Sequence, residues 1–474
     1  MLNSPTCPLA QHASDQPEAI ALVERRSNAP SVLWRYDQLH QQVEQQVRAL
    51  TKLGVKPGQH LLIASYDKAE IVRLIATSLR LGCVLIPINP AFPASQQLAL
   101  IERCDAAWFI GDLSYDDEPL PQSCRKLHLP PLANSTDASI TIGPISLTSP
   151  DAALTGVLTS GSSGTPKLAL HSFSNHIASA RGSRSLIPLQ SDDGWALSLP
   201  LYHIGGLAVV FRCLLAGASL IIPATDEPLQ QLLGESRLTH LSAVATQLHR
   251  LQQSKNDFTG SSVRQLLVGG GTITPAVLDW LAQQPLQSWI SYGLTEMGSQ
   301  VMTGPVCRDG SLARLLPHCQ LKLSPNNEIL VKGESLFLGY YHNGQCQQPL
   351  DQQGWFATRD LGQRDSQRAL SVIGRLDNQF ICGGENIQPE AIERTVCDYP
   401  GISECIVVPV ADDEYGQRPV AFINDLSAID SAHLEPWLRQ RLPGYQIPVR
   451  YLPLPATTGL KLNRNELIGL AARV

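Results

Sequence analysis

Apolar runs of strand length alternate with helical segments over most of this chain, and this alternation limits the possible fold more than any other feature. A segment of helical character at residues 36–53 precedes a strand-like run at 61–65, and a second one at 68–81 separates that run from the next, at 84–88. Such alternation favours mostly parallel sheets that are covered by helices on both faces. The same pattern predicts strands at 108–110, 196–199, 220–222, 266–268 and 288–291, and helices at 95–104, 175–184 and 275–284.

The pattern changes near Pro305, where short strands and turns replace the alternation. Strands are expected at 320–323, 328–331 and 371–373, with turn signals at Asn326-Asn327 and Asn343-Gly344. A compact α+β stretch follows, with helices at 388–398 and 432–442 and strands at 404–410 and 420–423. The fold class is therefore α/β, and we predict two domains, residues 1–376 and 377–474, that meet at Asp377.

Composition excludes several classes of function. Charged residues make up 16% of the chain, the net charge is −6 and no basic run occurs, so neither a nucleic acid nor an anionic membrane is an expected partner. Eleven cysteines without a C-x-x-C pair argue against a disulfide framework or a zinc site. The start of the chain lacks a secretory signal, and the most apolar stretch, residues 207–222, is too short and interrupted to span a bilayer. We expect a cytoplasmic protein.

Residues 159–167, with the sequence TSGSSGTPK, have the composition of a phosphate-binding loop. Glycines let backbone N–H groups turn toward one anion, and hydroxyls and an ammonium add further donors. Pro166 separates this loop from the Walker pattern, and apolar flanks predict a strand–loop–strand hairpin. A flexible Ser/Gly surface turn is the alternative. The candidate ligands are Thr159, Ser160, Gly161, Ser162, Ser163, Gly164, Thr165 and Lys167.

Two further segments follow predicted strands, where open α/β sheets bind ligands. Gly269, Gly270 and Gly271 present bare backbone on which a flat heterocycle could lie, or they form a tight turn before a helix. Residues 291–296, with the sequence SYGLTE, offer a ring for stacking and a carboxylate for Mg²⁺. Alternatively, Thr295 is a helix cap and Glu296 an acid of the first helical turn.

Four single residues are weaker candidates. Asp360 could accept two hydrogen bonds from a ribose, and Arg375 could reach the same sugar or a phosphate. His203 is either a catalytic residue or a hydrogen-bonded core residue. Arg212 lies in an apolar helix, so its guanidinium requires an anionic partner from the protein or from a substrate. Lys461, near the end of the chain, would by itself be a solvated surface lysine.

Taken together, the order and spacing of these motifs resemble the adenylate-forming superfamily, from about Ala19 to Leu467. That superfamily includes acyl-CoA synthetases, adenylation domains of peptide synthetases and firefly luciferase. The resemblance implies a large N-terminal domain of two doubly wound sheets plus a β-subdomain. It also implies a small, mobile α+β C-terminal domain that hinges at Asp377.

Within the superfamily, the chain looks like the bacterial 2-succinylbenzoate–CoA ligases of menaquinone biosynthesis. The segments that carry this narrower resemblance are residues 198–203, 244–248, 374–380, 383–389 and 408–412. The implied reaction joins the acid to AMP with release of pyrophosphate, and then transfers the acyl group to coenzyme A. ATP and Mg²⁺ are the implied cofactors, coenzyme A is a co-substrate, and a homo-oligomer is left open.

The resemblance also implies a role for each candidate residue. Lys461 would bridge the carboxylate and the α-phosphate, Glu296 and Thr165 would hold Mg²⁺, and the loop at 159–167 would bind the outer phosphates. Asp360 and Arg375 would bind the ribose. The remaining assignments are Gly269, Gly270, Gly271, Ser291, Tyr292, Gly293, Leu294 and Thr295 for the nucleotide; His203, Gly206, Arg212, Thr246 and Gln247 for the acid; and Gly383 and Gly384 for coenzyme A.

The chain departs from the family pattern at two positions. Gly459-Leu460-Lys461 has one residue more than the usual Gly-Lys pair, and Cys382 stands where many relatives carry a lysine or an arginine. Three alternatives remain. Another aryl- or fatty-acyl-CoA ligase is the nearest one, whereas a peptide-synthetase domain would carry an acidic residue within 207–211. A nucleotide-binding relative without turnover is disfavoured because Lys461, Glu296 and Thr165 are all present.

Overall fold

The structure is a computed structural model, and it describes most of the chain. The described residues are 6–27, 29–111, 119–129, 147, 149–159, 166–225, 227–271, 273–307, 310–312, 314–365, 369–424, 426–429, 431–455 and 464–473. No helix within these ranges is long and apolar enough to cross a membrane.

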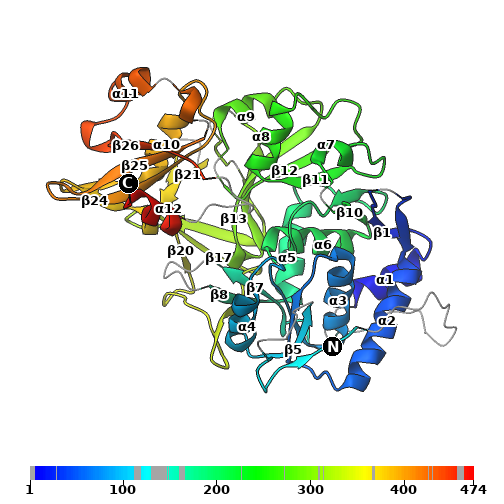
Figure 1. Ribbon diagram of the computed structural model, residues 1–474. Helices are drawn as coiled ribbons and strands as arrows, with labels where there is room; N and C mark the ends of the chain where they lie inside the picture. The colour runs from blue at the N-terminus through cyan, green and yellow to red at the C-terminus, as the bar shows by residue number, and fades with distance from the viewer. Residues whose placement is uncertain are drawn as a thin grey trace.

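The first large sheet has a parallel centre and antiparallel edges (Figure 1). The six central strands, β13, β12, β11, β9, β10 and β1, pair in parallel. β2 is antiparallel at one edge, and β14 and β15 are antiparallel at the other. In spatial order the strands are β15 (Arg314–Leu315), β14 (Ser299–Pro305), β13 (Gln287–Leu294), β12 (Gln265–Val268), β11 (His240–Ala243), β9 (Gly194–Ala196), β10 (Ser219–Ile222), β1 (Ile20–Glu24) and β2 (Val32–Arg35).

The second large sheet repeats this design. Its strands β7, β4, β3, β5 and β6 are parallel, and β8, β18 and β19 extend it antiparallel. The spatial order is β19 (Gln345–Gln347), β18 (Gly339–His342), β8 (Lys167–Ser172), β7 (Ala153–Thr159), β4 (Val84–Pro87), β3 (His60–Ala64), β5 (Ala106–Gly111) and β6 (Arg125–Lys126). All five residues of β3 are buried, as expected for a parallel strand that is covered on both faces.

Smaller sheets complete the molecule. A four-stranded antiparallel sheet consists of β16 (Cys319–Leu323), β17 (Glu328–Gly333), β20 (Phe356–Arg364) and β21 (Leu370–Arg375). The last hundred residues, coloured orange to red in Figure 1, contain β22 (Phe380–Cys382), β23 (Glu385–Ile387), β24 (Cys405–Asp412), β25 (Gly416–Ile423) and β26 (Arg450–Pro453). Their buried clusters contain no residue before Phe380. The boundary at Asp377 remains a prediction.

The helices begin and end where local sequence signals allow. Asp67 accepts a hydrogen bond from the Glu70 amide at the start of α3, and Gly82 ends that helix with a φ of 70°. The helices are α1 (Pro8–Asp15), α2 (Tyr36–Leu53), α3 (Lys68–Leu81), α4 (Ala94–Arg103), α5 (Phe173–Arg184), α6 (Ile204–Ala216), α7 (Leu229–Leu232), α8 (Ala245–Gln253), α9 (Pro275–Leu281), α10 (Pro389–Cys397), α11 (Ser431–Arg439) and α12 (Arg464–Ala471). Single 3₁₀ turns are η1 (Thr295–Met297), η2 (Leu376–Asn378), η3 (Leu426–Ala428) and η4 (Gly444–Gln446).

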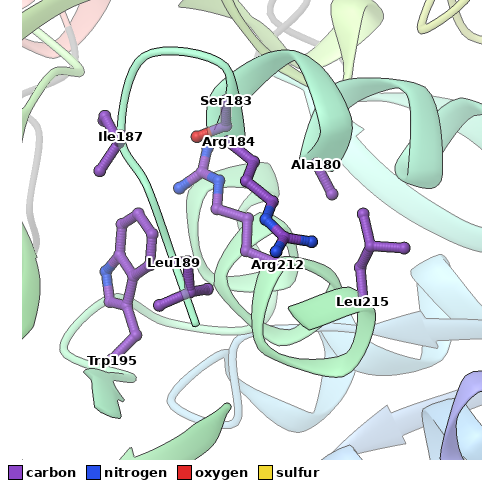
Figure 2. Close-up of a pocket in the computed structure, with 8 residues that line it drawn as sticks. All are labelled: Ala180, Ser183, Arg184, Ile187, Leu189, Trp195, Arg212 and Leu215. Carbon is purple, nitrogen blue, oxygen red and sulfur yellow. The ribbon is translucent and has the colours of Figure 1, made fainter. Parts of the chain in front are cut away.

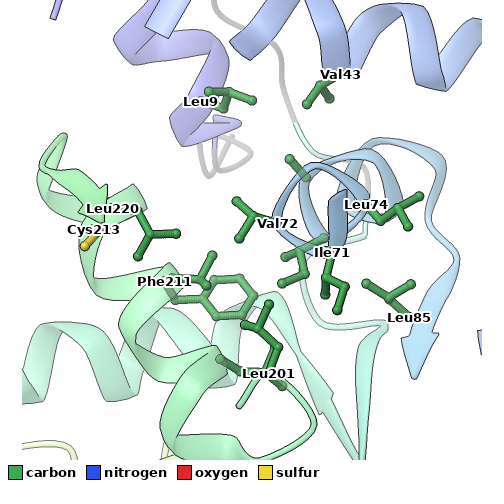
Figure 3. Packing of buried hydrophobic residues seen from close by; sticks show 14 of the residues in the cluster. Leu9, Val43, Ile71, Val72, Leu74, Leu85, Leu201, Phe211, Cys213 and Leu220 are labelled. Carbon is green, nitrogen blue, oxygen red and sulfur yellow. The ribbon is translucent and has the colours of Figure 1, made fainter. Parts of the chain in front are cut away.

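One buried cluster joins the two large sheets. Leu85 of β4 and Leu220 of β10 belong to the same cluster as Val72 of α3 and Phe211 of α6 (Figure 3). The Phe211 ring is completely buried and stacks on the ring of His176, with 3.9 Å between the centroids. Truncation of a buried phenylalanine to alanine typically costs about 3–5 kcal/mol. Helix α6, which carries His203 and Arg212 of the candidate site, is therefore firmly anchored between the sheets.

Candidate active site

The candidate phosphate loop connects two paired strands. β7 ends at Thr159 and β8 begins at Lys167, and these two residues are directly opposite each other in the antiparallel ladder. The predicted strand–loop–strand hairpin is therefore confirmed. Ser160, Gly161, Ser162, Ser163, Gly164 and Thr165 lie outside the described residues, so their contacts stay predictions. The exposed ammonium of Lys167 lies 5.0 Å from the centroid of the Tyr340 ring.

Glu296 lies in η1, directly after β13, and neighbouring elements hold it at both ends. Its carboxylate oxygen Oε1 accepts a hydrogen bond of 2.5 Å from the Tyr340 hydroxyl, and its backbone oxygen accepts one of 2.8 Å from the Phe337 amide. Burial and the Glu296 carboxylate both raise the pKa of Tyr340, so the phenol keeps its proton. His171 of β8 contacts the Thr295 carbonyl oxygen at 2.7 Å. The first large sheet is thereby tied to the second at the candidate metal ligand.

The chemistry of Glu296 fits Mg²⁺. Protein sites for this ion often supply only one or two carboxylates, because phosphates of the substrate and water complete the coordination. Consistent with this, the described residues contain no group of three or more His, Cys, Asp or Glu side chains that could hold a metal. The half-buried Glu296 carboxylate uses one oxygen for Tyr340, and among the described residues the other oxygen has no hydrogen-bond partner. Thr165, the second predicted metal ligand, lies outside the described residues.

The triple glycine lies at the carboxyl end of β12. At Gly269, a Cβ atom would come 2.9 Å from the Ser291 hydroxyl of β13, so a larger residue there would require this side chain to move. Gly270 and Gly271 are exposed, and apart from the adjacent chain, no atom of the described residues lies within 4 Å of where a Cβ of Gly271 would be. Both can therefore accept a flat ligand against bare backbone, as predicted for an adenine.

Gly293 has a structural reason that the sequence did not reveal. A Cβ atom at this position would lie 2.0 Å from the backbone oxygen of Ser299 on the antiparallel partner β14. The irregular pairing of β13 and β14 at this point needs a glycine before any ligand is considered. Leu294 forms the end of β13, beside this irregularity.

Asp360 on β20 is the centre of a second polar group. Its Oδ2 accepts a 2.7 Å hydrogen bond from the Tyr292 hydroxyl, and its Oδ1 lies 3.0 Å from Nη1 of Arg375. Arg375 also reaches Asp377, with 3.1 Å between Nη2 and Oδ2. The two predicted ribose ligands and the predicted hinge residue are thus connected. We expected the Tyr292 ring to stack on a base; in the structure its hydroxyl positions Asp360, and stacking stays a prediction.

A strained residue precedes Asp360. Arg359 has a φ of 62°, a left-handed value that is uncommon for residues other than glycine, and β20 pairs irregularly with β17 around it. The Arg359 amide donates a hydrogen bond of 2.9 Å to Glu328. Irregularities of this kind often redirect a side chain near a functional site. Here the bulge presents Asp360 to Tyr292 and Arg375.

His203 and Gly206 begin helix α6. His203 is exposed at the N-cap position, and its ring packs edge-on against Tyr202 at 4.8 Å. The interpretation of His203 as a core residue is therefore wrong, because the helix starts at the surface. Gly206 is buried, and a Cβ atom there would lie 2.2 Å from the Pro200 carbonyl oxygen. Backbone packing thus explains this glycine, and its contact with an acid remains a prediction.

Arg212 is buried in α6 and has neutral partners. Its Nη2 donates to Gln300 at 2.8 Å and to Ser299 at 3.4 Å, and its guanidinium lies 5.0 Å from the Trp195 ring. Among the described residues, no carboxylate pairs with Arg212, and its Nε has no hydrogen-bond partner. Burial lowers the pKa of Arg212 to about 10. The sequence left open a protein or a substrate anion, and the substrate contact of Arg212 stays a prediction.

A small pocket borders Arg212 at the carboxyl ends of α5 and α6. Figure 2 shows the side chains of Arg184 and Arg212 extending into it beside the Trp195 ring. Arg184 is exposed, whereas Arg212 is 4% exposed. The two arginines therefore share a location but differ in hydration, which makes Arg184 a suitable reference for the role of Arg212.

Thr246 and Gln247 lie in the first turn of α8, immediately after β11. Gln247 accepts a 3.1 Å hydrogen bond from the Val244 amide, so its side chain caps this helix. Both residues are half-buried beside the end of β11, next to the triple glycine of β12. Their predicted contact with the acid is compatible with this place in the sheet and stays a prediction.

Gly383 and Gly384 form the exposed turn between β22 and β23, with φ values of 58° and 87°. The Gly383 amide donates to the Tyr415 carbonyl oxygen at 2.9 Å. Cys382 is buried and its pKa is raised by burial, so it offers a thiol rather than a reactive thiolate. Lys461 lies outside the described residues. All eleven cysteines are free.

Comparison with known proteins agrees with this arrangement. The model of the AMP-binding enzyme family matches residues 9–341, and that of the AMP-binding enzyme C-terminal domain matches residues 391–465. The chain belongs to the AMP-binding enzyme family. Among curated members, it is 33% identical to the 2-succinylbenzoate–CoA ligase of Escherichia coli strain K12, with 95% of each chain covered. It is 31% identical to the same-named ligase of Haemophilus influenzae, with 92% of each covered.

Solved structures of AMP-binding enzymes extend the similarity to the fold. A variant of Escherichia coli MenE with bound OSB-AMS has a TM-score of 0.85 and 30% identity, and the match covers 99% of both chains. The o-succinylbenzoate coenzyme A synthetase of Bacillus subtilis in complex with ATP and magnesium ion has a TM-score of 0.86 and 26% identity, over 98% and 99% of the chains. The predicted α/β architecture, with a large N-terminal and a small C-terminal domain, is confirmed.

In this AMP-binding enzyme, the structure joins predicted residues that are far apart in sequence. Lys167, Glu296, Tyr292 and Asp360 belong to one series of contacts that runs through Tyr340 and the end of β13. The contact of His203 with Tyr202 and that of Gly383 with Tyr415 are separate from that series. The sequence analysis missed Tyr340, because only the pairing of β18 with β8 brings this tyrosine beside Lys167.

Proposed function

We propose that this chain ligates 2-succinylbenzoate to coenzyme A in menaquinone biosynthesis, using ATP and forming an acyl-adenylate intermediate. The observation that carries the choice of acid is Arg212, a buried cation in helix α6 that no carboxylate of the described residues neutralises. A charge in such a place is stabilised when a ligand supplies the counter-charge. An aromatic dicarboxylate leaves a second carboxylate for Arg212 after the first has reacted. The full-length relatives named 2-succinylbenzoate–CoA ligase support the same substrate.

In the first step, a carboxylate oxygen of the acid attacks the α-phosphorus of ATP, and pyrophosphate leaves. This step brings two anions together, so neutralisation and alignment are the main catalytic needs. Lys167 and the donors of the 159–165 segment would hold the β- and γ-phosphates, and Lys461 would bridge the carboxylate and the α-phosphate. Mg²⁺, held by Glu296 and by Thr165, would neutralise charge on the phosphate oxygens.

The remaining residues would orient the two substrates. The Asp360 carboxylate accepts hydrogen bonds from Tyr292 and Arg375, and because each carboxylate oxygen can accept more than one hydrogen bond, it could also accept from the ribose hydroxyls. The adenine would lie on the bare backbone of Gly270 and Gly271. His203, at the exposed start of α6, would face the reacting carboxylate, while Arg212, more than two turns further along that helix, would bind the distal one.

In the second step, the sulfur of coenzyme A attacks the acyl carbonyl carbon, and AMP leaves with the oxygen that linked it to the acid. The exposed Gly383–Gly384 turn would line the path of the pantetheine arm, because a chain without side chains leaves room for it. For this step the C-terminal domain, hinged at Asp377, would rotate and withdraw Lys461.

Acid-dependent pyrophosphate exchange tests this proposal. The purified protein, Mg·ATP and labelled pyrophosphate are combined with 2-succinylbenzoate, benzoate, a medium-chain fatty acid or an amino acid. We expect exchange to be fastest with 2-succinylbenzoate, followed by thioester formation when coenzyme A is added. Faster exchange with benzoate or the fatty acid would assign the chain to another group of acyl-CoA ligases and remove the substrate role of Arg212.

A further inference from the structure

Tyr340 contacts two candidate ligand-binding groups at once. Its hydroxyl donates a 2.5 Å hydrogen bond to Oε1 of Glu296, and the ammonium of Lys167 lies 5.0 Å from its ring centroid. Phe337 packs edge-on against the ring, with 4.8 Å between centroids and 72° between planes. Tyr340 therefore has a fixed ring and a directed hydroxyl.

The backbone explains this position. Tyr340 pairs with Ala169 in the antiparallel ladder of β18 and β8, and the Leu338 amide donates to the Leu170 carbonyl oxygen at 2.8 Å. Lys167 lies two residues before Ala169, hence on the same face and diagonal to Tyr340. The Phe337 amide binds the backbone oxygen of Glu296 at 2.8 Å. One short segment, residues 337–340, thus holds both the main chain and the carboxylate of Glu296.

The contact leaves the second carboxylate oxygen of Glu296 for a metal. Mg²⁺ requires near-ideal octahedral geometry and takes few protein ligands, so a single carboxylate must be well oriented to contribute. Residues that hydrogen-bond to a metal ligand orient it, and their loss typically lowers metal affinity about 10- to 100-fold. The ring, in turn, offers its face to the Lys167 ammonium beside the phosphate loop.

We propose that Tyr340 is a positioning residue that fixes Glu296 toward the Mg²⁺ of Mg·ATP and keeps Lys167 directed to the phosphates. This inference rests on the proposed function, because it assumes that Glu296 and Lys167 bind Mg·ATP. It assigns one side chain to both the metal carboxylate and the phosphate lysine, so metal binding and phosphate binding depend on the same residue.

The matched pair Tyr340→Phe and Tyr341→Phe tests the hydroxyl. Tyr341 is the next residue on β18 and faces the other way, where its hydroxyl donates to Asp105 at 2.8 Å. For Tyr340→Phe, we expect the Mg²⁺ concentration that gives half-maximal pyrophosphate exchange to rise about 10- to 100-fold. The Michaelis constant for the acid should not change, and Tyr341→Phe should behave like the wild type. Calorimetric titration with ATP, with and without Mg²⁺, measures the same loss without turnover.

A double-substitution cycle separates positioning from a general structural effect. If Tyr340 acts through Glu296, Tyr340→Phe should add no loss of Mg²⁺ dependence in a Glu296→Gln background. Tyr340→Leu removes the ring as well, and we expect it to raise the Michaelis constant for ATP above that of Tyr340→Phe. A Tyr340→Phe variant with wild-type Mg²⁺ dependence, or an equal loss in both backgrounds, would overturn the inference. Wild-type protein without any acid-dependent exchange would instead refute the proposed function.

Discussion

Replacing Arg212 by methionine should impair acid binding while leaving the unliganded protein nearly as stable as before. Burial holds the pKa of Arg212 at about 10, below its ordinary value. At about 1.4 kcal/mol per pKa unit, the charge costs the folded state roughly 3 kcal/mol at neutral pH. Because the folded pKa is the lower one, this cost is complete below about pH 10 and decreases as the pH rises above it.

The contacts of the guanidinium offset this cost. A hydrogen bond of a charged group contributes about 1.5–3 kcal/mol, and a desolvated cation on an aromatic ring about 2 kcal/mol. Gln300 and Trp195 supply one of each. Methionine fills a similar volume, and no described carboxylate would lose an ion-pair partner. We therefore expect the free energy of unfolding to change by no more than about 2 kcal/mol, unlike the 3–5 kcal/mol typical of a broken buried ion pair.

The loss of acid binding should be larger. A carboxylate bound to Arg212 gains one or two charge-assisted hydrogen bonds, together about 2–4 kcal/mol, or roughly 30- to 1,000-fold in affinity. We expect the ratio kcat/KM for 2-succinylbenzoate to fall by that factor, with the Michaelis constant for ATP unchanged. Thermal denaturation with and without the acid measures both effects, since a ligand that binds the folded state raises the melting temperature.

Arg184→Met is the matched control, because Arg184 borders the same pocket but is exposed. It should change neither the acid-dependent stabilisation nor kcat/KM. The reasoning is refuted if Arg212→Met strongly destabilises the unliganded protein while its kinetic constants for the acid remain those of the wild type. Arg212 would then be a structural residue.

Three further predictions concern the nucleotide, the reaction steps and pH. Lys461→Ala should raise the activation free energy of adenylate formation by about 3 kcal/mol, the effect typical of losing one transition-state charge contact. Thioester formation from synthetic acyl-adenylate should be unaffected, and equal losses in both steps would contradict this. Asp360→Asn should raise the Michaelis constant for ATP about tenfold in steady-state assays, because a charged acceptor becomes neutral; an unchanged constant would contradict a ribose contact. Burial lowers the pKa of His171 and His318 to about 4. The stability that their neutral side chains contribute is therefore fully present above the ordinary histidine pKa and is lost as the pH falls toward 4. At about pH 5, each histidine should lower the free energy of unfolding by about 2 kcal/mol relative to pH 7.5. Denaturant titrations at the two pH values measure this difference, and equal midpoints would contradict it.

Local sequence signals predicted much of the fold. Helices α2 and α3 have the predicted bounds, because their apolar positions repeat with helical spacing and a glycine ends each one. The hairpin around residues 159–167 followed from the apolar runs on both sides of the loop. These features depend only on residues close together in the chain, so a sequence contains the information directly.

Contacts between distant segments could not be predicted in the same way. Tyr340 lies 44 residues from Glu296, and Tyr292 lies 68 residues from Asp360. A tyrosine in a short strand such as β18 has no sequence feature that names its partner. Gly206 and Gly293 were assigned to ligand contacts, and those contacts stay predictions, but close packing against Pro200 and Ser299 already requires a glycine at each position.

The segment from Tyr292 to Glu296 is the point at which three sheets meet at the candidate site. Tyr292 contacts Asp360 of the four-stranded sheet, and Glu296 contacts Tyr340 of the second large sheet, while both belong to the end of β13 and the turn that follows it in the first. The residue that holds the candidate ribose ligand and the candidate metal ligand are therefore four residues apart on one support. A change that shifts this support should weaken nucleotide and metal binding together. Loss of the Arg212 charge removes only side-chain bonds to Ser299 and Gln300 of β14, so we expect it to act mainly on the acid. If the three sheets, rather than any single motif, determine the geometry of the site, nucleotide binding and metal binding should change together. Acid binding should change separately from both.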